Sequence, residues 1–78
     1  MRWEPNALLA YSAVPFDPAA CVLHYGQGIF EGLKAYKNSD GTIRLFRPRA
    51  NFERLNRSAK RVCMPEVGVD FVMKALIE

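Results

Sequence analysis

The chain has 78 residues, a mass of 8.8 kDa and a formal net charge of +3. Half of its residues are hydrophobic and 24% are charged, which is typical of a globular protein and excludes a disordered or fibrous chain. A chain of this length forms at most one small domain and buries a smaller share of its surface than a larger one. We therefore do not expect a deep pocket formed by these residues alone.

The cysteine and histidine content limits the metal and redox chemistry. Cys21 and Cys63 lie far apart in the sequence, and His24 is the only imidazole. A structural zinc site needs about four such ligands at short spacings, so we expect no metal. Two buried thiols in a reducing compartment are the expected state, with a disulfide between them as the alternative.

Neither a secretory signal nor a membrane span is indicated. The first residues lack the apolar run of a signal peptide, and no stretch approaches the roughly 18 apolar residues of a transmembrane helix. We expect a soluble intracellular protein without a membrane partner. The cytoplasm is the favoured compartment, with a mitochondrion or plastid as alternatives.

The first third of the chain carries weak structural signals. Residues Leu8 to Tyr11 are predicted as a short strand, followed by a proline-containing loop. Residues 19 to 31 could form one or two helical turns, although Gly26 and Gly28 each cost about 1 kcal/mol in a helix relative to alanine. Such glycines favour positive φ or a close approach of another group to the backbone.

A hairpin is predicted over residues 33 to 47. LKAYK (33 to 37) and TIRLFR (42 to 47) alternate apolar with polar residues, and NSDG (38 to 41) between them is a cluster of turn formers. The alternation places Leu33 and Ala35 on one face and Lys34 and Tyr36 on the other.

Two helices are predicted after the hairpin. The first spans residues 49 to 62, with Pro48 in its first turn and an apolar stripe at three- and four-residue steps formed by Phe52, Leu55, Ala59 and Val62. Met64 and Pro65 should end it. The second begins near Val69 and runs to Glu78 without a stop signal, so we expect it to be cut rather than finished.

The first helix also carries a basic stripe, and its cluster of cations comprises Arg49, Arg54, Arg57, Lys60 and Arg61. Three interpretations are a solvated helix face, contacts with nucleic-acid phosphates, and one inward-facing arginine that binds a small anion. Glu53 interrupts the cluster and no known recognition motif surrounds it, which argues against nucleic acid. Arg54 is the best anion-binding candidate because it lies between the basic and apolar stripes, within the first turns of the helix.

The run HYGQGIFEGLKAYK (24 to 37), followed by IRLFRP, NFERLNRSAKR and MP, resembles the N-terminal part of branched-chain amino-acid aminotransferases. The resemblance runs from about Asp17 to Pro65 and is weaker beyond. Enzymes of this family are fold-type IV pyridoxal-phosphate proteins. The resemblance implies an α+β fold in which a short antiparallel sheet carries packed helices, with residues 1 to 78 as a partial N-terminal small domain and the C-terminal large catalytic domain absent.

The resemblance also implies roles for individual residues. Arg54 matches the arginine that grips the cofactor phosphate, Tyr25 an active-site tyrosine beside the substrate, and Phe30 an aromatic that lines the pocket for an aliphatic side chain. Lys34 matches a basic position at the pocket rim, where we expect it to be exposed to solvent. Glu31 and Gly32 match structural members of the motif. The lysine that forms the Schiff base with pyridoxal phosphate matches no residue of this chain, so no catalytic residue is assigned.

The function implied is reversible amino transfer between leucine, isoleucine or valine and 2-oxoglutarate, by a parent protein that is a homodimer with small-molecule substrates and no nucleic-acid partner. The chain alone is expected to be inactive. The alternatives are a non-catalytic interaction fragment that buries the apolar face of residues 69 to 77, and a small basic module that binds anions or nucleic acid.

Overall fold

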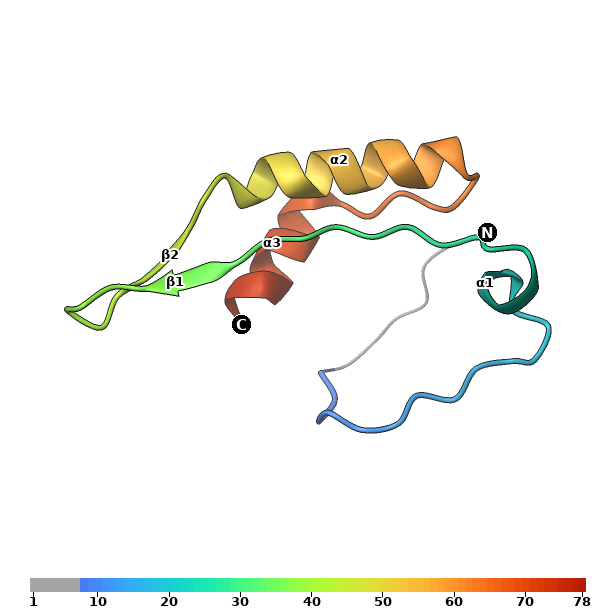
Figure 1. Ribbon diagram of the computed structural model, residues 1–78, viewed down its shortest axis with the longest axis horizontal. Helices are drawn as coiled ribbons and strands as arrows, with labels where there is room; N and C mark the ends of the chain where they lie inside the picture. The colour runs from blue at the N-terminus through green and yellow to red at the C-terminus, as the bar shows by residue number, and fades with distance from the viewer. Residues whose placement is uncertain (1–7) are drawn as a thin grey trace.

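The computed structural model describes residues 8 to 78, and Figure 1 shows their arrangement. The elements are α1 (Cys21–His24), β1 (Ala35–Lys37), β2 (Ile43–Leu45), α2 (Pro48–Arg61) and α3 (Val69–Ile77). The two strands form an antiparallel sheet, and the two longer helices follow it in the chain. The α+β character expected from the sequence is therefore confirmed.

The hairpin is present, with shorter strands than predicted. Ala35 pairs with Leu45, Tyr36 with Arg44 and Lys37 with Ile43. Its turn is held by the Asp40 carboxylate, which accepts hydrogen bonds from the Thr42 backbone N–H at 3.0 Å and from the Thr42 hydroxyl at 2.7 Å. These bonds lower the pKa of Asp40. The hairpin projects from the rest of the molecule (Figure 1). Within residues 8 to 78, each of its strands therefore pairs with the other strand alone.

Helix α2 confirms the predicted helix, and its start shows how the chain leaves the sheet. Arg47 precedes it in the left-handed region (φ 46°, ψ 52°), and Pro48 occupies the first helical position. Pro48 fits there because its missing N–H would have no intrahelical partner. On the apolar stripe, Phe52 and Ala59 are 9% and 2% exposed and are the buried hydrophobic residues of the described part of the chain.

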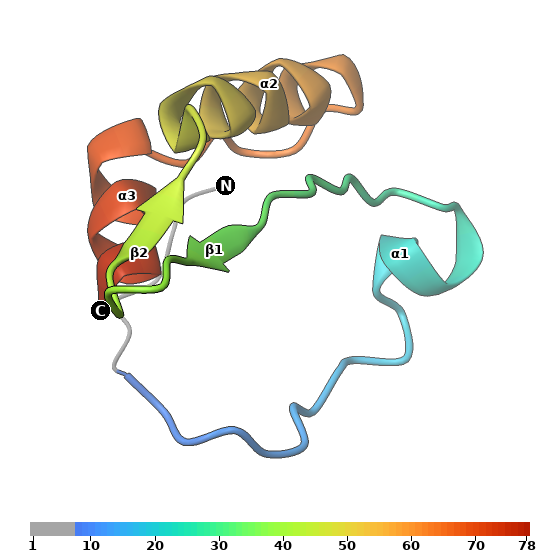
Figure 2. The same cartoon turned by 60° about the vertical axis from the view of Figure 1, so that its left-hand side comes forward.

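Helix α3 lies beside α2 (Figure 2), and polar contacts join the two. The Asn56 side chain donates to the Val67 carbonyl at 2.7 Å and accepts from the Val67 N–H at 2.8 Å. An ion pair joins Arg49 on α2 to Asp70 on α3 at 2.5 Å. The Asn56 pairing satisfies both backbone polar groups of Val67 and fixes the approach of the chain to α3.

The first third of the chain has one predicted element that is absent and one that is present. Residues Leu8 to Tyr11 form no strand; they lie in an irregular segment where the described chain offers no strand to pair with. One predicted helical turn is present as α1, and Gly26 after it adopts φ +62°, one of the conformations expected for this glycine. From there to β1 the chain is extended and runs along α2 (Figures 1 and 2).

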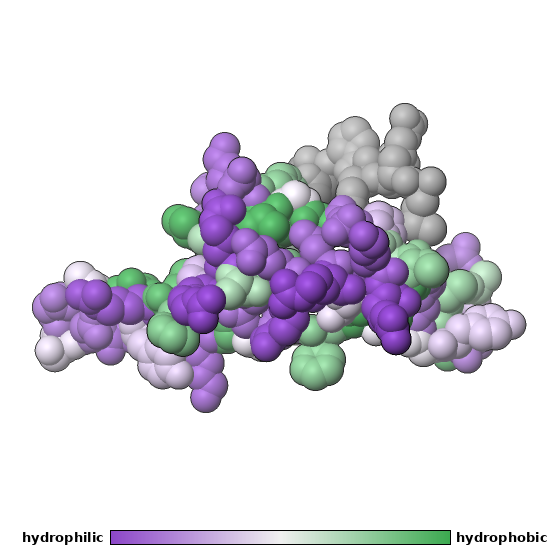
Figure 3. Space-filling model, turned by 90° about the horizontal axis from the view of Figure 1, so that it is seen from above, coloured by the Kyte–Doolittle hydropathy of each residue, from purple (hydrophilic) through white to green (hydrophobic). Residues whose placement is uncertain are grey.

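The described chain is open in shape. Its radius of gyration is 15.0 Å, against about 11.5 Å for a compact domain of this length. Large apolar side chains remain exposed, among them Leu8, Tyr11, Phe16, Phe30, Phe46 and Ile77. Figure 3 shows hydrophilic residues over α2 with hydrophobic residues exposed around them. The fold thus presents side chains outward on short elements rather than enclosing a large core.

Candidate functional site

A carboxylate from the extended segment meets two side chains of α2. Arg54 donates from Nε to Glu31 Oε2 at 2.8 Å and from Nη2 to Glu31 Oε1. Asn51 donates from Nδ2 to Glu31 Oε1 at 2.9 Å and to the Gly32 carbonyl at 2.8 Å. Asn51 and Arg54 are three residues apart and so lie on the same side of the helix. We call these three side chains the Glu31 cluster.

Burial and charge in the Glu31 cluster are uneven. The Glu31 side chain is 8% exposed, whereas that of Arg54 is 60% exposed. Hydrogen bonding from Arg54 is the largest cause that lowers the pKa of Glu31 to about 2, helped by Asn51 and opposed by desolvation. The same pair raises the pKa of Arg54. Both groups are therefore fully ionised at neutral pH.

The exposed part of Arg54 has donors to offer a ligand. The bonds to Glu31 engage Nε and Nη2, so Nη1 makes no hydrogen bond within residues 8 to 78. Arg54 and Arg57 line two adjoining surface hollows, one completed by Ile29, Ser58, Arg61 and Val62 and the other by Phe46, Arg47, Ala50 and Asn51. A guanidinium with a free edge among further cations is suited to a phosphate or carboxylate.

The helix dipole contributes little to anion binding at Arg54. Helix α2 begins at Pro48, which puts Arg54 nearly two turns inside it. The field of the helix dipole falls off within the first turn, so it adds little at Arg54. An anion at this position would depend on the guanidinium itself and on neighbouring cations.

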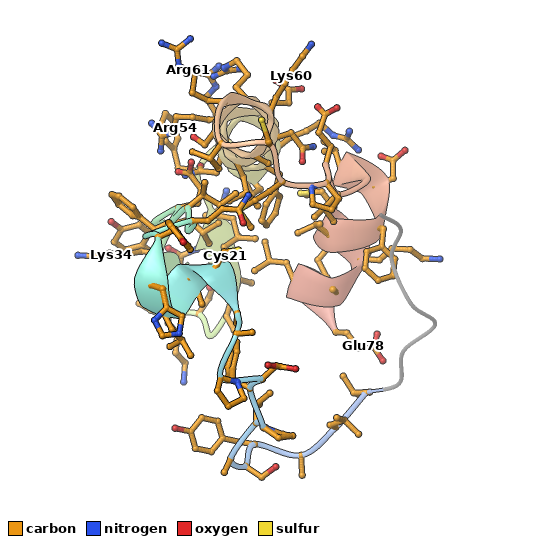
Figure 4. All side chains as sticks on the ribbon, turned by 90° about the vertical axis from the view of Figure 1, so that its right-hand side faces the viewer. Cys21, Lys34, Arg54, Lys60, Arg61 and Glu78 are labelled. Atoms are coloured by element: carbon orange, nitrogen blue, oxygen red, sulfur yellow. The ribbon has the colours of Figure 1, made fainter. Side chains whose placement is uncertain are left out.

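Of the other predicted site residues, Phe30 and Lys34 lie on the extended segment before β1, and Tyr25 caps the end of α1. Lys34 is exposed, as expected, and lines a hollow of about 410 Å³ with Gly32, Leu33, Tyr36, Phe46 and Asn51. Figure 4 shows Lys34 and Arg54 extending on the same side of the molecule. Asn51 lines the hollows of both cations, so the structure brings Lys34 and Arg54 to neighbouring parts of one surface.

Tyr25 and Phe30 point into solvent. They are 86% and 90% exposed, so Phe30 is not a core aromatic of the described fold. Neither belongs to the Glu31 cluster. The structure therefore places Tyr25 at the end of α1 and Phe30 on the extended segment that carries Glu31 and Lys34, and leaves both rings available to other groups.

The cysteines differ from expectation. Cys21 and Cys63 are both free and both exposed, so the predicted burial of the thiols is wrong. Within residues 8 to 78, no three His, Cys, Asp or Glu side chains gather as a metal site would require. No helix in this part of the chain has the length and apolar character needed to cross a membrane.

Two residues of this surface were not identified from the sequence. Asn51 could have been found from its position one helical turn before Arg54. Gln27 donates from Nε2 to the Val62 carbonyl at 2.9 Å and joins the glycine-rich segment to the end of α2. Its position between two glycines gives no signal for a contact 35 residues away.

The sequence of the chain is similar to those of several known proteins. The chain is 45% identical over 76 residues to branched-chain-amino-acid transaminase 1 of Bacillus subtilis, which covers 97% of this chain and 21% of the relative. It is 47% identical over 74 residues to the branched-chain-amino-acid aminotransferase of Mycolicibacterium smegmatis, covering 95% and 20%. A protein named branched-chain-amino-acid aminotransferase 5, chloroplastic, of Arabidopsis thaliana is 48% identical over 75 residues, covering 96% and 18%.

These matches confirm the resemblance inferred from the sequence and extend it over nearly the whole chain. The chain spans about one fifth of the length of the curated relatives it matches, which fits a fragment. No family model matches.

Proposed function

We propose that these residues are part of the N-terminal small domain of a branched-chain amino-acid aminotransferase, a pyridoxal-phosphate enzyme of fold type IV. The large catalytic domain would lie in the part of the family's length that these 78 residues do not span. Similarity to relatives that carry this name, over nearly every residue of the chain, is the observation that supports the proposal most strongly.

Arg54 is the residue of this chain that would hold the cofactor, through its phosphate group. The observation in favour is that its guanidinium is fixed on one edge by Glu31 and is 60% exposed. A guanidinium offers paired donors that match phosphate oxygens. When bound, pyridoxal phosphate supplies the electron sink that amino transfer requires, while Arg54 binds and orients its phosphate.

Tyr25, Phe30 and Lys34 would act on the substrate. An aliphatic side chain offers no hydrogen bond by which to be selected, so apolar walls must recognise it. The exposed rings of Tyr25 and Phe30 provide such surface once a substrate and the large domain cover them. Lys34, at the rim, would attract the carboxylate of the amino acid or the 2-oxo acid.

The whole protein would transfer the amino group of leucine, isoleucine or valine to 2-oxoglutarate and act as a homodimer, and this chain alone would be inactive. The test is amino transfer by the whole protein with leucine, isoleucine, valine and D-alanine as donors. We expect activity with the three branched-chain donors. Preference for D-alanine, or no transfer from any of the three, would overturn the proposal.

A further inference from the structure

We propose that Glu31, with Asn51, is a positioning residue that fixes Arg54 in the orientation needed to grip the cofactor phosphate. The inference rests on the proposed function and goes further than it, because it assigns a role to a carboxylate that itself repels phosphate. Glu31 does not touch the ligand in this account; it acts through Arg54.

The geometry of the Glu31 carboxylate carries the inference. Every side-chain partner it has is a donor: Arg54 Nε on Oε2, and Arg54 Nη2 with Asn51 Nδ2 on Oε1. Two parallel bonds from a planar guanidinium fix its rotation as well as its position. Arg54 would otherwise be a flexible, mostly exposed side chain that loses rotamer freedom when it binds a ligand.

Asn51 fixes the carboxylate in turn. It bridges Glu31 Oε1 and the carbonyl of Gly32 at 2.9 and 2.8 Å, so the extended segment and α2 are joined at the point where Arg54 is held. The Glu31 side chain is 8% exposed, which leaves little room for it to turn away. The cluster thus holds the guanidinium through Nε and Nη2, and these bonds leave Nη1 unused.

A competing electrostatic view makes the opposite prediction. If only net charge matters, Glu31 weakens phosphate binding because it neutralises Arg54, and its removal should strengthen binding. If orientation dominates, removal should weaken binding although the site becomes more positive. Glu31→Gln separates the two views. The amide has the same shape as the carboxylate but no charge, and its NH2 group faces one of the N–H donors of Arg54 or Asn51, which in the wild type meet carboxylate oxygens.

The experiment is a titration of the whole apo-protein with pyridoxal phosphate and with pyridoxal, which lacks the phosphate. The variants are E31Q, R54A and the double variant, compared with wild type by dissociation constant. We expect E31Q to weaken pyridoxal phosphate binding about tenfold, as for loss of a charged hydrogen-bonded pair, and to leave pyridoxal binding unchanged. In the R54A background, E31Q should change binding less than about twofold, because residues that act through one another are not additive.

Two further variants complete the design. Asp70→Asn breaks an ion pair that joins α2 to α3 rather than to the extended segment, and should leave both dissociation constants unchanged. Asn51→Ala removes one donor from Glu31 and should weaken pyridoxal phosphate binding about threefold, as for one hydrogen bond. It provides the test if E31Q does not fold.

The outcomes distinguish the inference from the function on which it rests. If E31Q binds pyridoxal phosphate as tightly as wild type or more tightly, while R54A loses affinity, the positioning role is wrong and the proposed function stands. If R54A does not reduce the preference for pyridoxal phosphate over pyridoxal, the phosphate-binding role of Arg54 is wrong, and the inference is overturned with it.

Discussion

Gln27 donates a hydrogen bond from Nε2 to the Val62 carbonyl at 2.9 Å, joining the glycine-rich segment to the residue that caps the C-terminal end of α2. The last carbonyls of a helix lack intrahelical partners. Gln27 supplies a partner for the carbonyl that follows the last turn of α2. The same bond holds the segment that leads to Phe30 and Glu31 against the helix.

Replacing Gln27 by alanine should loosen this segment. The change removes the bond and leaves the part-buried Val62 carbonyl without its donor, which costs about 1 kcal/mol. Hydrogen exchange of the whole protein should show faster exchange over residues 21 to 28, with α3 unchanged. Ser12→Ala, which removes an exposed side-chain bond to the Ala10 carbonyl, is the control. Equal exchange over residues 21 to 28 in both variants would contradict the tethering role.

Asn56 should matter more than an ordinary helix surface residue. Its amide makes two bonds to the Val67 backbone, so Asn56→Ala leaves a donor and an acceptor unpaired and should cost about 2 kcal/mol of unfolding free energy. Asn56→Asp keeps the acceptor and loses the donor, and should fall between alanine and wild type. Urea unfolding of the whole protein measures both changes. If the aspartate variant is no more stable than the alanine variant, the paired geometry is not the source of the effect.

The Glu31 carboxyl should titrate far below its ordinary range. Its pKa in the fold is about 2, against an ordinary value of 4.5. A lowered pKa means that the stabilisation is fully present above about pH 4.5 and is lost as the pH falls toward 2. Carbon NMR of the side-chain carboxyl in the whole protein should give this low value. In Arg54→Ala the pKa of Glu31 should rise toward its ordinary value, because the largest cause that lowers it is lost while the Asn51 bond remains; an unchanged value in that variant would contradict the pairing.

Substitution of Gly41 should lower the stability of the protein through its backbone conformation and not through a steric clash. It adopts φ +89° in the hairpin turn, and a Cβ added there would meet nothing within 4 Å. Gly41→Ala should therefore cost about 1 to 2 kcal/mol through the left-handed backbone alone. Gly32→Ala is a matched control, because Gly32 has no positive φ and a Cβ added there would likewise meet nothing within 4 Å. Urea unfolding should separate the two variants; equal stability would contradict the backbone explanation.

The parts of the fold that follow local rules were predictable from the sequence. The hairpin has alternation and a turn cluster, and the two longer helices have apolar steps and a proline at the expected places. The end of α1 and the Leu8 to Tyr11 segment were harder to predict, because they depend on a positive φ at Gly26 and on the lack of a pairing strand within residues 8 to 78. The Glu31 cluster depends on contacts about 20 residues apart in the sequence, which local patterns do not encode. The exposure of the cysteines likewise depends on the open arrangement of the chain.

The most direct test of the central claim is a crystal structure of the whole protein with pyridoxal phosphate bound. We predict that Arg54 Nη1 or Nη2 donates to a phosphate oxygen within about 3 Å, while Arg54 Nε remains on Glu31. A cofactor phosphate bound by other residues, with Arg54 in solvent, would contradict the account.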